Sequence, residues 1–216
     1  MTDFSTIAST ATSYLALAIS GTTAWLTLFR KGKLKMTRPT VVFFGPDDHN
    51  HPKVFLRTLL YSTAKRPHIV ENMFIRLQAD ESSQSFNIWV YGETKALSRG
   101  SGLRVSEEGV VCNHHFLLPT GAAAFEFTPG EYSVEVYATL TNEKKSLLLS
   151  TIKLYVTPPE SSAMKSAQAG LYFDWEPDLQ RYQTHLDSRP SELASSPVPF
   201  VELTKGQLSL QNPHRD

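Results

Sequence analysis

Alternation of apolar and polar side chains is the strongest constraint on how this chain folds. Between positions 40 and 157, apolar residues recur at every second position in short runs rich in Val, Ile, Phe, Tyr and Leu. The runs end at Gly, Pro, Ser or clustered charges, as strands do where the chain turns. We therefore expect a mainly β domain. The predicted strands are 40–45, 54–61, 68–78, 85–91, 97–105, 109–118, 123–128, 131–140 and 146–156.

The alternation also predicts which side chains face the core, because successive side chains of a strand point to opposite faces. The predicted inward set of 109–118 is Val110, Cys112, His114, Phe116 and Leu118. The predicted inward set of 131–140 is Tyr132, Val134, Val136, Ala138 and Leu140. One face of each strand is therefore expected to pack into a single core.

Two local motifs resemble parts of immunoglobulin-like and fibronectin type III sandwiches. The first is a strand, turn and strand over 55–77, with the turn Ser-Thr-Ala-Lys-Arg-Pro at 62–67. The second, Pro-Gly-Glu-Tyr at 129–132, is similar to the corner before the penultimate strand, where a tyrosine hydroxyl commonly satisfies backbone groups. The resemblance implies one immunoglobulin-like antiparallel β-sandwich over 37–157, with Tyr132 at the corner, and it implies no activity. A calcium-dependent lipid-binding sandwich is the alternative topology.

An uncharged run of 24 residues, 6–29, precedes the β region, and five cations follow it by position 38. A helix rises about 1.5 Å per residue, so such a run can cross a hydrocarbon core roughly 30 Å thick. The run predicts a single-pass transmembrane helix within an N-terminal segment of 1–36. The predicted anchor residues are Tyr14, Leu15, Leu17, Ile19, Trp25, Leu26, Leu28, Phe29, Arg30 and Lys31.

The basic cluster also predicts an orientation. Lys and Arg beside a membrane span stay on the cytoplasmic side, so we expect the N-terminus outside and the large domain in the cytoplasm, at a plasma or inner membrane. The lone Cys112 agrees, since one thiol cannot form an intrachain disulfide. Small side chains recur at every fourth position of the run and would allow a homo-oligomer through the helix. They are Thr12, Ala16, Ser20 and Ala24.

Charge and motifs limit the function classes. The chain has 21 basic and 21 acidic residues and therefore no net field that would attract nucleic acid, so we expect no nucleic-acid partner. We find no specific catalytic or cofactor motif, so we expect no cofactor and no enzyme. The sequence favours a membrane-anchored, non-enzymatic interaction or scaffolding module with an unidentified protein partner. Lipid recognition by the sandwich itself is one alternative function.

A second alternative function is metal-dependent binding or catalysis at the loop 46–52. This loop concentrates oxygen and nitrogen ligands between two strands, namely Asp47, Asp48, His49 and His51. Hard cations prefer several oxygens and zinc prefers imidazole or thiolate, so the loop alone could supply only part of either site. A solvated turn started by Asp and Asn explains the same residues equally well.

Cys112 and His114 share one face of a predicted strand. A thiol and an imidazole on an apolar face are more typical of a buried Cys beside a satisfied His than of a nucleophile and its base.

Aromatic side chains outside the core can anchor a protein partner. Trp89, Tyr91 and Tyr137 lie opposite the clearer core sets of their strands and are candidates for such contacts. The alternative is that they belong to the core, since the strand over 86–91 is apolar on both faces.

After position 157 the alternation stops. Repeated Pro and Ser predict a largely irregular, flexible tail over 158–216. Within it, an aromatic island at 171–177 holds Tyr172, Phe173 and Trp175 beside acidic residues, and it is predicted to be a docking motif. The alternative is that the island folds back onto the sandwich.

Overall fold

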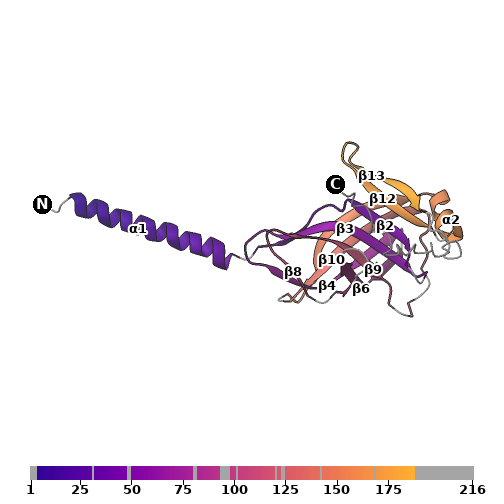
Figure 1. Ribbon diagram of the computed structural model, residues 1–216, viewed down its shortest axis with the longest axis horizontal. Helices are drawn as coiled ribbons and strands as arrows, with labels where there is room; N and C mark the ends of the chain where they lie inside the picture. Colours follow the sequence, from indigo (N-terminus) through magenta and orange to yellow (C-terminus); the bar gives the residue numbers. More distant parts are fainter. Residues whose placement is uncertain are drawn as a thin grey trace, which may run out of the picture.

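The fold consists of two antiparallel β-sheets that enclose one core, with a helix projecting from one end (Figure 1). The computed structural model describes residues 4–30, 32–47, 50–79, 82–92, 98–100, 102–119, 121–122, 125–141, 143–167 and 169–187. The predicted mainly β, sandwich-like class is confirmed.

The larger sheet contains eight described strands in the order β13-β12-β2-β3-β9-β6-β7, with β1 paired to β3. Their bounds are β1 Leu34–Met36, β2 Val41–Pro46, β3 Pro52–Ser62, β6 Ile88–Gly92, β7 Ser98–Arg99, β9 Val110–Leu117, β12 Gly170–Glu176 and β13 Arg181–Asp187.

The smaller sheet contains five described strands in the order β11-β10-β4-β5, with β8 paired to β4. Their bounds are β4 His68–Ala79, β5 Ser82–Phe86, β8 Leu103–Val105, β10 Gly130–Leu140 and β11 Leu147–Val156.

The predicted inward faces are confirmed in the two strands where the alternation is clearest. In β9, Cys112, His114 and Phe116 are buried, whereas Val111 is 49% exposed. In β10 the even positions from 132 to 140 are all buried. The Tyr132 hydroxyl donates a hydrogen bond to the Thr128 carbonyl oxygen at 2.7 Å, as expected for a tyrosine at this corner.

Two predicted strands are each divided between the sheets. The segment 85–91 breaks at Asn87, so that β5 belongs to the smaller sheet and β6 to the larger. The segment 97–105 divides in the same way into β7 and β8. At the second crossing a Cβ on Gly100 would lie 2.0 Å from the Trp89 ring, so only glycine fits there. The predicted strand at 123–128 is wrong, since the described residues 125–128 form no strand.

The prediction of a largely irregular tail is wrong for residues 158–187. This segment forms helix α2 (Pro158–Ala167), followed by the β12–β13 hairpin on the edge of the larger sheet. Helix α2 starts with a capping box, in which the Thr157 N–H donates to Glu160 Oε2 at 2.8 Å and the Glu160 N–H donates to Thr157 Oγ1 at 3.4 Å. The sandwich thus extends to residue 187, and the predicted tail beyond it lies outside the described residues.

The N-terminal run is helical, as helix α1 (Phe4–Ala24) continued by the π-helical turn η1 (Trp25–Phe29). None of the described helices combines the length and the apolar character that crossing a membrane requires. Ser and Thr side chains interrupt the apolar ones along α1. The predicted transmembrane helix therefore has no support from the structure. Of the predicted anchor residues, Lys31 lies outside the described part.

Candidate functional site

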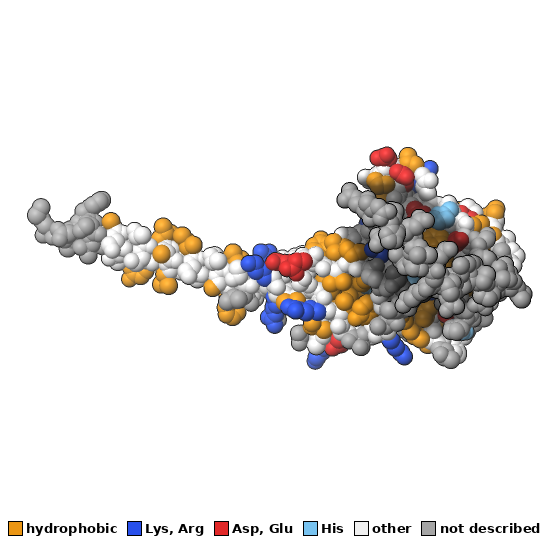
Figure 2. All heavy atoms as spheres, in the orientation of Figure 1, with side chains coloured by type: hydrophobic (Ala, Val, Ile, Leu, Met, Phe, Trp, Pro, Cys, Tyr) orange, Lys and Arg blue, Asp and Glu red, His pale blue; other side chains and the backbone are white. Residues whose placement is uncertain are grey.

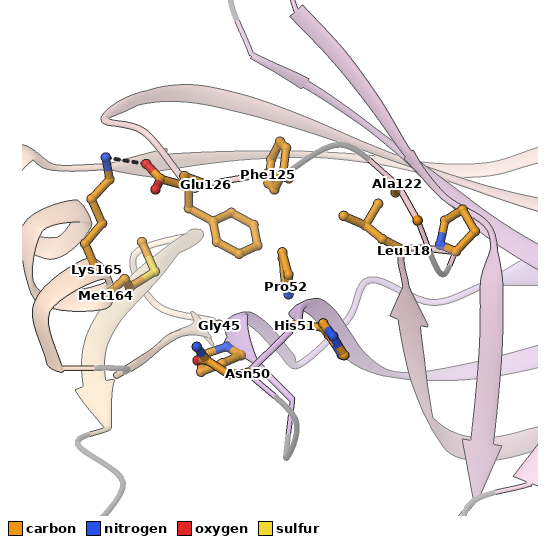
Figure 3. Close-up of a pocket in the computed structure, with 14 residues that line it drawn as sticks. Gly45, Asn50, His51, Pro52, Leu118, Ala122, Phe125, Glu126, Met164 and Lys165 are labelled. Carbon is orange, nitrogen blue, oxygen red and sulfur yellow. Dashed lines mark ion pairs between the residues drawn. The ribbon is translucent and has the colours of Figure 1, made fainter.

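The candidate binding site is a pocket of about 600 Å³ at one end of the sandwich (Figure 3). Three segments that are distant in sequence form it: the loop between β2 and β3, the connection between β9 and β10, and the end of α2. The Ser161 hydroxyl of α2 donates to the Phe127 carbonyl oxygen at 2.8 Å and ties the helix to the connection. The capping box of α2 and this bond together position the C-terminal wall of the pocket.

Apolar side chains line much of the pocket. They include Leu118, Phe125, Phe127 and Met164. The ring of Phe127 stacks on core residue Phe44, with centroids 4.8 Å apart, and meets the Phe125 ring edge to face at 5.1 Å. The apolar wall is therefore continuous with the core and is held in place by it.

The polar rim comes from two places. Glu126 and Lys165 form an ion pair at one end of the pocket, while Leu118 lies at the other (Figure 3). Both charged side chains are about half exposed, so the pair contributes at most about 1 kcal/mol to stability. Across the pocket lie Asn50 and His51 of the loop predicted to bind metal.

The polar groups of the loop form hydrogen bonds that close its own turn. The His51 N–H donates to Asp47 Oδ1 at 2.8 Å, and the two side chains approach to 3.6 Å between His51 Nδ1 and Asp47 Oδ2. The Asp47 N–H donates to the His51 carbonyl oxygen at 2.7 Å, and Asn50 has a left-handed φ of 64°. The other two predicted metal ligands, Asp48 and His49, lie outside the described residues. Within the described ranges, no three His, Cys, Asp or Glu side chains gather as a metal site requires.

Cys112 and His114 form a buried cluster with Trp89. The Trp89 indole N–H donates to His114 Nδ1 at 3.1 Å, while His114 Nε2 lies 3.3 Å from Cys112 Sγ. Since Nδ1 accepts a hydrogen bond, the proton of the neutral imidazole sits on Nε2. The sulfur lies beside the ring, 3.3 Å from Nε2 and 4.0 Å from Nδ1. Burial lowers the pKa of His114 to about 4, and the neighbouring His115 adds to this shift. The lowered pKa makes the imidazole a poor base for the neighbouring thiol.

The six aromatic partner candidates divide into two groups. Trp89 and Phe173 are each 1% exposed and belong to the core, so neither side chain is on the surface. The other four are half-buried: Tyr91, Tyr137, Tyr172 and Trp175. Tyr91 stacks on Trp89, Tyr137 on Phe74, and Tyr172 on His185. The partner role of these four side chains stays a prediction.

Trp175 belongs to a second hollow, a groove of about 680 Å³ between β11 and the β12–β13 hairpin. The Arg38 guanidinium lies 3.9 Å from the centre of the Trp175 ring, and the Tyr182 hydroxyl donates to the Pro39 carbonyl oxygen at 2.8 Å. Burial raises the pKa of Tyr182 to about 12, although the charge of Arg38 opposes the shift.

Sequence reasoning missed Arg38, Arg181 and Tyr182 as groove residues because it did not predict β13. The Pro177-Asp178 pair after the aromatic island is a turn signal that could have revealed the hairpin.

No family model matches the chain, and no curated protein matches it. Among solved structures, one similar chain belongs to a family 123 glycoside hydrolase from Clostridium perfringens, studied for glycolipid glycan hydrolysis. The two chains are 9% identical with a TM-score of 0.33, and the match covers 59% of this chain and 27% of the hydrolase chain. A likeness this distant carries no argument about activity.

Proposed function

We propose that the protein is a non-enzymatic interaction module that its N-terminal helix attaches to a membrane. The observation that carries the proposal is the apolar surface of this helix, which projects away from the sandwich (Figures 1 and 2). Leu15 is 62% exposed, Leu17 69% and Trp25 63%. Burying such surface away from water gains about 25 cal/mol per Å², and exposed apolar surface of this extent marks a contact site.

The hydroxyl groups of the helix are compatible with burial in lipid. Five of these hydroxyl groups donate to the carbonyl oxygen four residues earlier, at 2.8 to 3.0 Å. These side chains are Thr12, Ser13, Thr22, Thr23 and Thr27. A hydroxyl without a partner in an apolar medium costs several kcal/mol, so these bonds lower the cost of membrane insertion.

Basic side chains at the base of the helix support the same proposal. Arg30, Lys33 and Lys35 are exposed, and Figure 2 shows Lys and Arg side chains, with acidic side chains among them, where the helix meets the sandwich. Each cation near an anionic surface contributes about 1 kcal/mol to binding. Because Lys and Arg beside a membrane segment stay on the cytoplasmic side, the sandwich would lie on the cytoplasmic face of a plasma or inner membrane.

The immunoglobulin-like assignment and the non-enzymatic role belong to the same proposal. The Tyr132 hydrogen bond to Thr128 supports an immunoglobulin-like corner. The burial of His114 supports binding over catalysis at Cys112, because it makes the imidazole a poor base for the thiol.

The test compares the full-length protein with the variant Leu17→Glu/Ile19→Glu in the same cells. We expect the native protein to stay in the membrane pellet after an alkaline wash. The variant should become soluble, because one charge in the hydrocarbon centre costs about 2.5 to 3.5 kcal/mol. A matched control, Val111→Glu on the exposed face of β9, should stay in the pellet.

Two outcomes would contradict the proposal. A native protein that is soluble after cell lysis would exclude membrane attachment. A double variant that remains in the pellet would exclude the helix as the anchor and favour lipid recognition by the sandwich itself.

A further inference from the structure

One side of the groove at β11 is the edge of a sheet. Residues 150–155 line it consecutively, and among the described strands β11 pairs with β10 alone. The second edge of β11 therefore faces the groove with its backbone N–H and C=O groups. A free edge of this kind is a template for pairing with another strand.

The opposite side of the groove is one face of the β12–β13 hairpin. Trp175 pairs with Tyr182 and Phe173 with Thr184 in the antiparallel register, so all four side chains point to the same face. All four also line the groove. The groove therefore occupies the place where one more strand of the smaller sheet would lie opposite the hairpin.

The charged side chains of the groove are mostly positive. Lys153 Nζ lies 3.1 Å from Glu131 Oε1, and these two charges neutralise one another. Arg38 and Arg181 also line the groove, and neither forms an ion pair with a carboxylate in the described part of the chain. The charges of Arg38 and Arg181 can therefore pair with carboxylates of a partner.

We propose that this groove binds an extended segment of a partner protein, in which apolar and acidic residues alternate, as an added strand beside β11. Strand addition of this kind takes its affinity from backbone hydrogen bonds and its specificity from alternate side chains. The apolar side chains of the segment would pack beside Trp175 and Tyr182. Its carboxylates would pair with the guanidinium of Arg181 and with that of Arg38, which lies over the Trp175 ring. The groove volume of about 680 Å³ lies within the range of ligand sites.

The inference rests on the proposed function and names the class of partner. The test uses the full-length protein in detergent micelles and a fluorescein-labelled probe, the heptapeptide Glu-Val-Glu-Val-Glu-Val-Glu. Two control peptides isolate its features: one replaces every Glu by Lys, and one has the same composition in the order Glu-Glu-Glu-Glu-Val-Val-Val. Fluorescence anisotropy should show binding of the alternating acidic peptide and at least tenfold weaker binding of both controls.

Variants and hydrogen exchange then locate the site. Arg181→Glu should weaken the acidic peptide at least about tenfold, because like charges across an interface repel. Arg99→Glu, an exposed position at the opposite edge of the larger sheet, should leave binding unchanged. Bound peptide should slow amide exchange in residues 150–155, since strand addition engages the free edge of β11.

Several results would overturn the inference. They are equal binding of the three peptides, unchanged binding by Arg181→Glu, or no new protection of residues 150–155. Alternate amides of 150–155 already pair with β10, so only the remaining amides report on the free edge. Protection of these remaining amides before any peptide is added would mean that the edge is already occupied. Peptide binding does not require lipid. If the protein binds the peptide but fails the membrane test, the groove proposal stands and only membrane attachment is contradicted.

Discussion

The sandwich and the N-terminal helix treat apolar side chains in opposite ways. In the sandwich, Trp89 and Phe173 are 1% exposed. In the helix, Leu17 is 69% exposed and Ile19 59%. The sandwich buries its apolar side chains in its own core. The helix exposes its apolar side chains, which would be stabilised by burial against lipid or another molecule. The burial of the sandwich core places stability in the sandwich, and our proposal places attachment in the helix, so substitutions should separate the two.

The largest loss of stability is expected from the core aromatics. Trp89→Ala and Phe173→Ala should each lower the free energy of unfolding by about 3 to 5 kcal/mol, because each leaves a cavity. Phe173 is the sharper probe, since it lies in the segment that the sequence predicted to be irregular. Denaturant unfolding followed by circular dichroism measures both effects. A loss below about 1 kcal/mol for Phe173→Ala would show that the hairpin is not part of the folded unit.

The next effect is a pH dependence from His114. Its pKa is about 4 in the folded protein and near its ordinary value of 6.5 when unfolded, so the unfolded state binds one more proton between these values. Above pH 6.5 the titration of His114 does not lower the free energy of unfolding. As the pH falls from 6.5 to 4, it lowers the free energy of unfolding by up to about 3 kcal/mol.

The matched variant is His114→Gln, whose amide oxygen can accept the hydrogen bond from the Trp89 indole N–H. Its free energy of unfolding should fall less steeply with pH between 6.5 and 4 than that of the native protein. Parallel pH profiles of the two proteins would mean that His114 titrates normally.

A smaller loss is expected at the sandwich corner. Tyr132→Phe keeps the ring and removes the hydroxyl that donates to the Thr128 carbonyl oxygen. The free energy of unfolding should fall by about 1 kcal/mol, since a part-buried hydrogen bond is lost. Tyr155→Phe, at a position that is 58% exposed, is the control and should change stability by less than about 0.5 kcal/mol. Equal effects of both substitutions would mean that the Tyr132 hydrogen bond does not stabilise the sandwich.

The smallest effect on stability is expected from the helix. Leu17→Glu/Ile19→Glu should change the free energy of unfolding of the sandwich by less than about 0.5 kcal/mol, because both side chains lie on the surface of the projecting helix. The same denaturant experiment in detergent measures it. A loss of several kcal/mol would mean that the helix packs on the sandwich, and the contrast between the two regions would fail.

Sequence periodicity predicted the fold best where one strand stays in one sheet. In β9 and β10 every residue keeps its predicted face. Trp89 was placed outside because 85–91 was taken as one strand, whereas the chain changes sheets at Asn87 and thereby changes which parity faces the core. A break of one residue carries no periodic signal of its own, so alternation alone could not reveal this crossing.

The candidate site was harder to predict because tertiary contacts create it. His51 was singled out, yet the apolar wall opposite it comes from Phe125 and Met164, which are distant in sequence. The hairpin was missed because Asp174 and Glu176 interrupt its apolar pattern. In β12 both lie on the face opposite the buried Leu171 and Phe173. Its stability comes from Leu171 and Phe173 packing in the core, which no local pattern displays.

The most direct test of the central claim is quenching of Trp25 by lipids with brominated acyl chains. Full-length protein would be reconstituted with vesicles of phosphatidylcholine and phosphatidylglycerol, and its tryptophan fluorescence compared with that in unbrominated vesicles. The account predicts quenching that is lost in Trp25→Phe, because Trp89 is buried and Trp175 lies in the groove of the sandwich. Absence of quenching, or quenching that persists in Trp25→Phe, would contradict attachment through the helix.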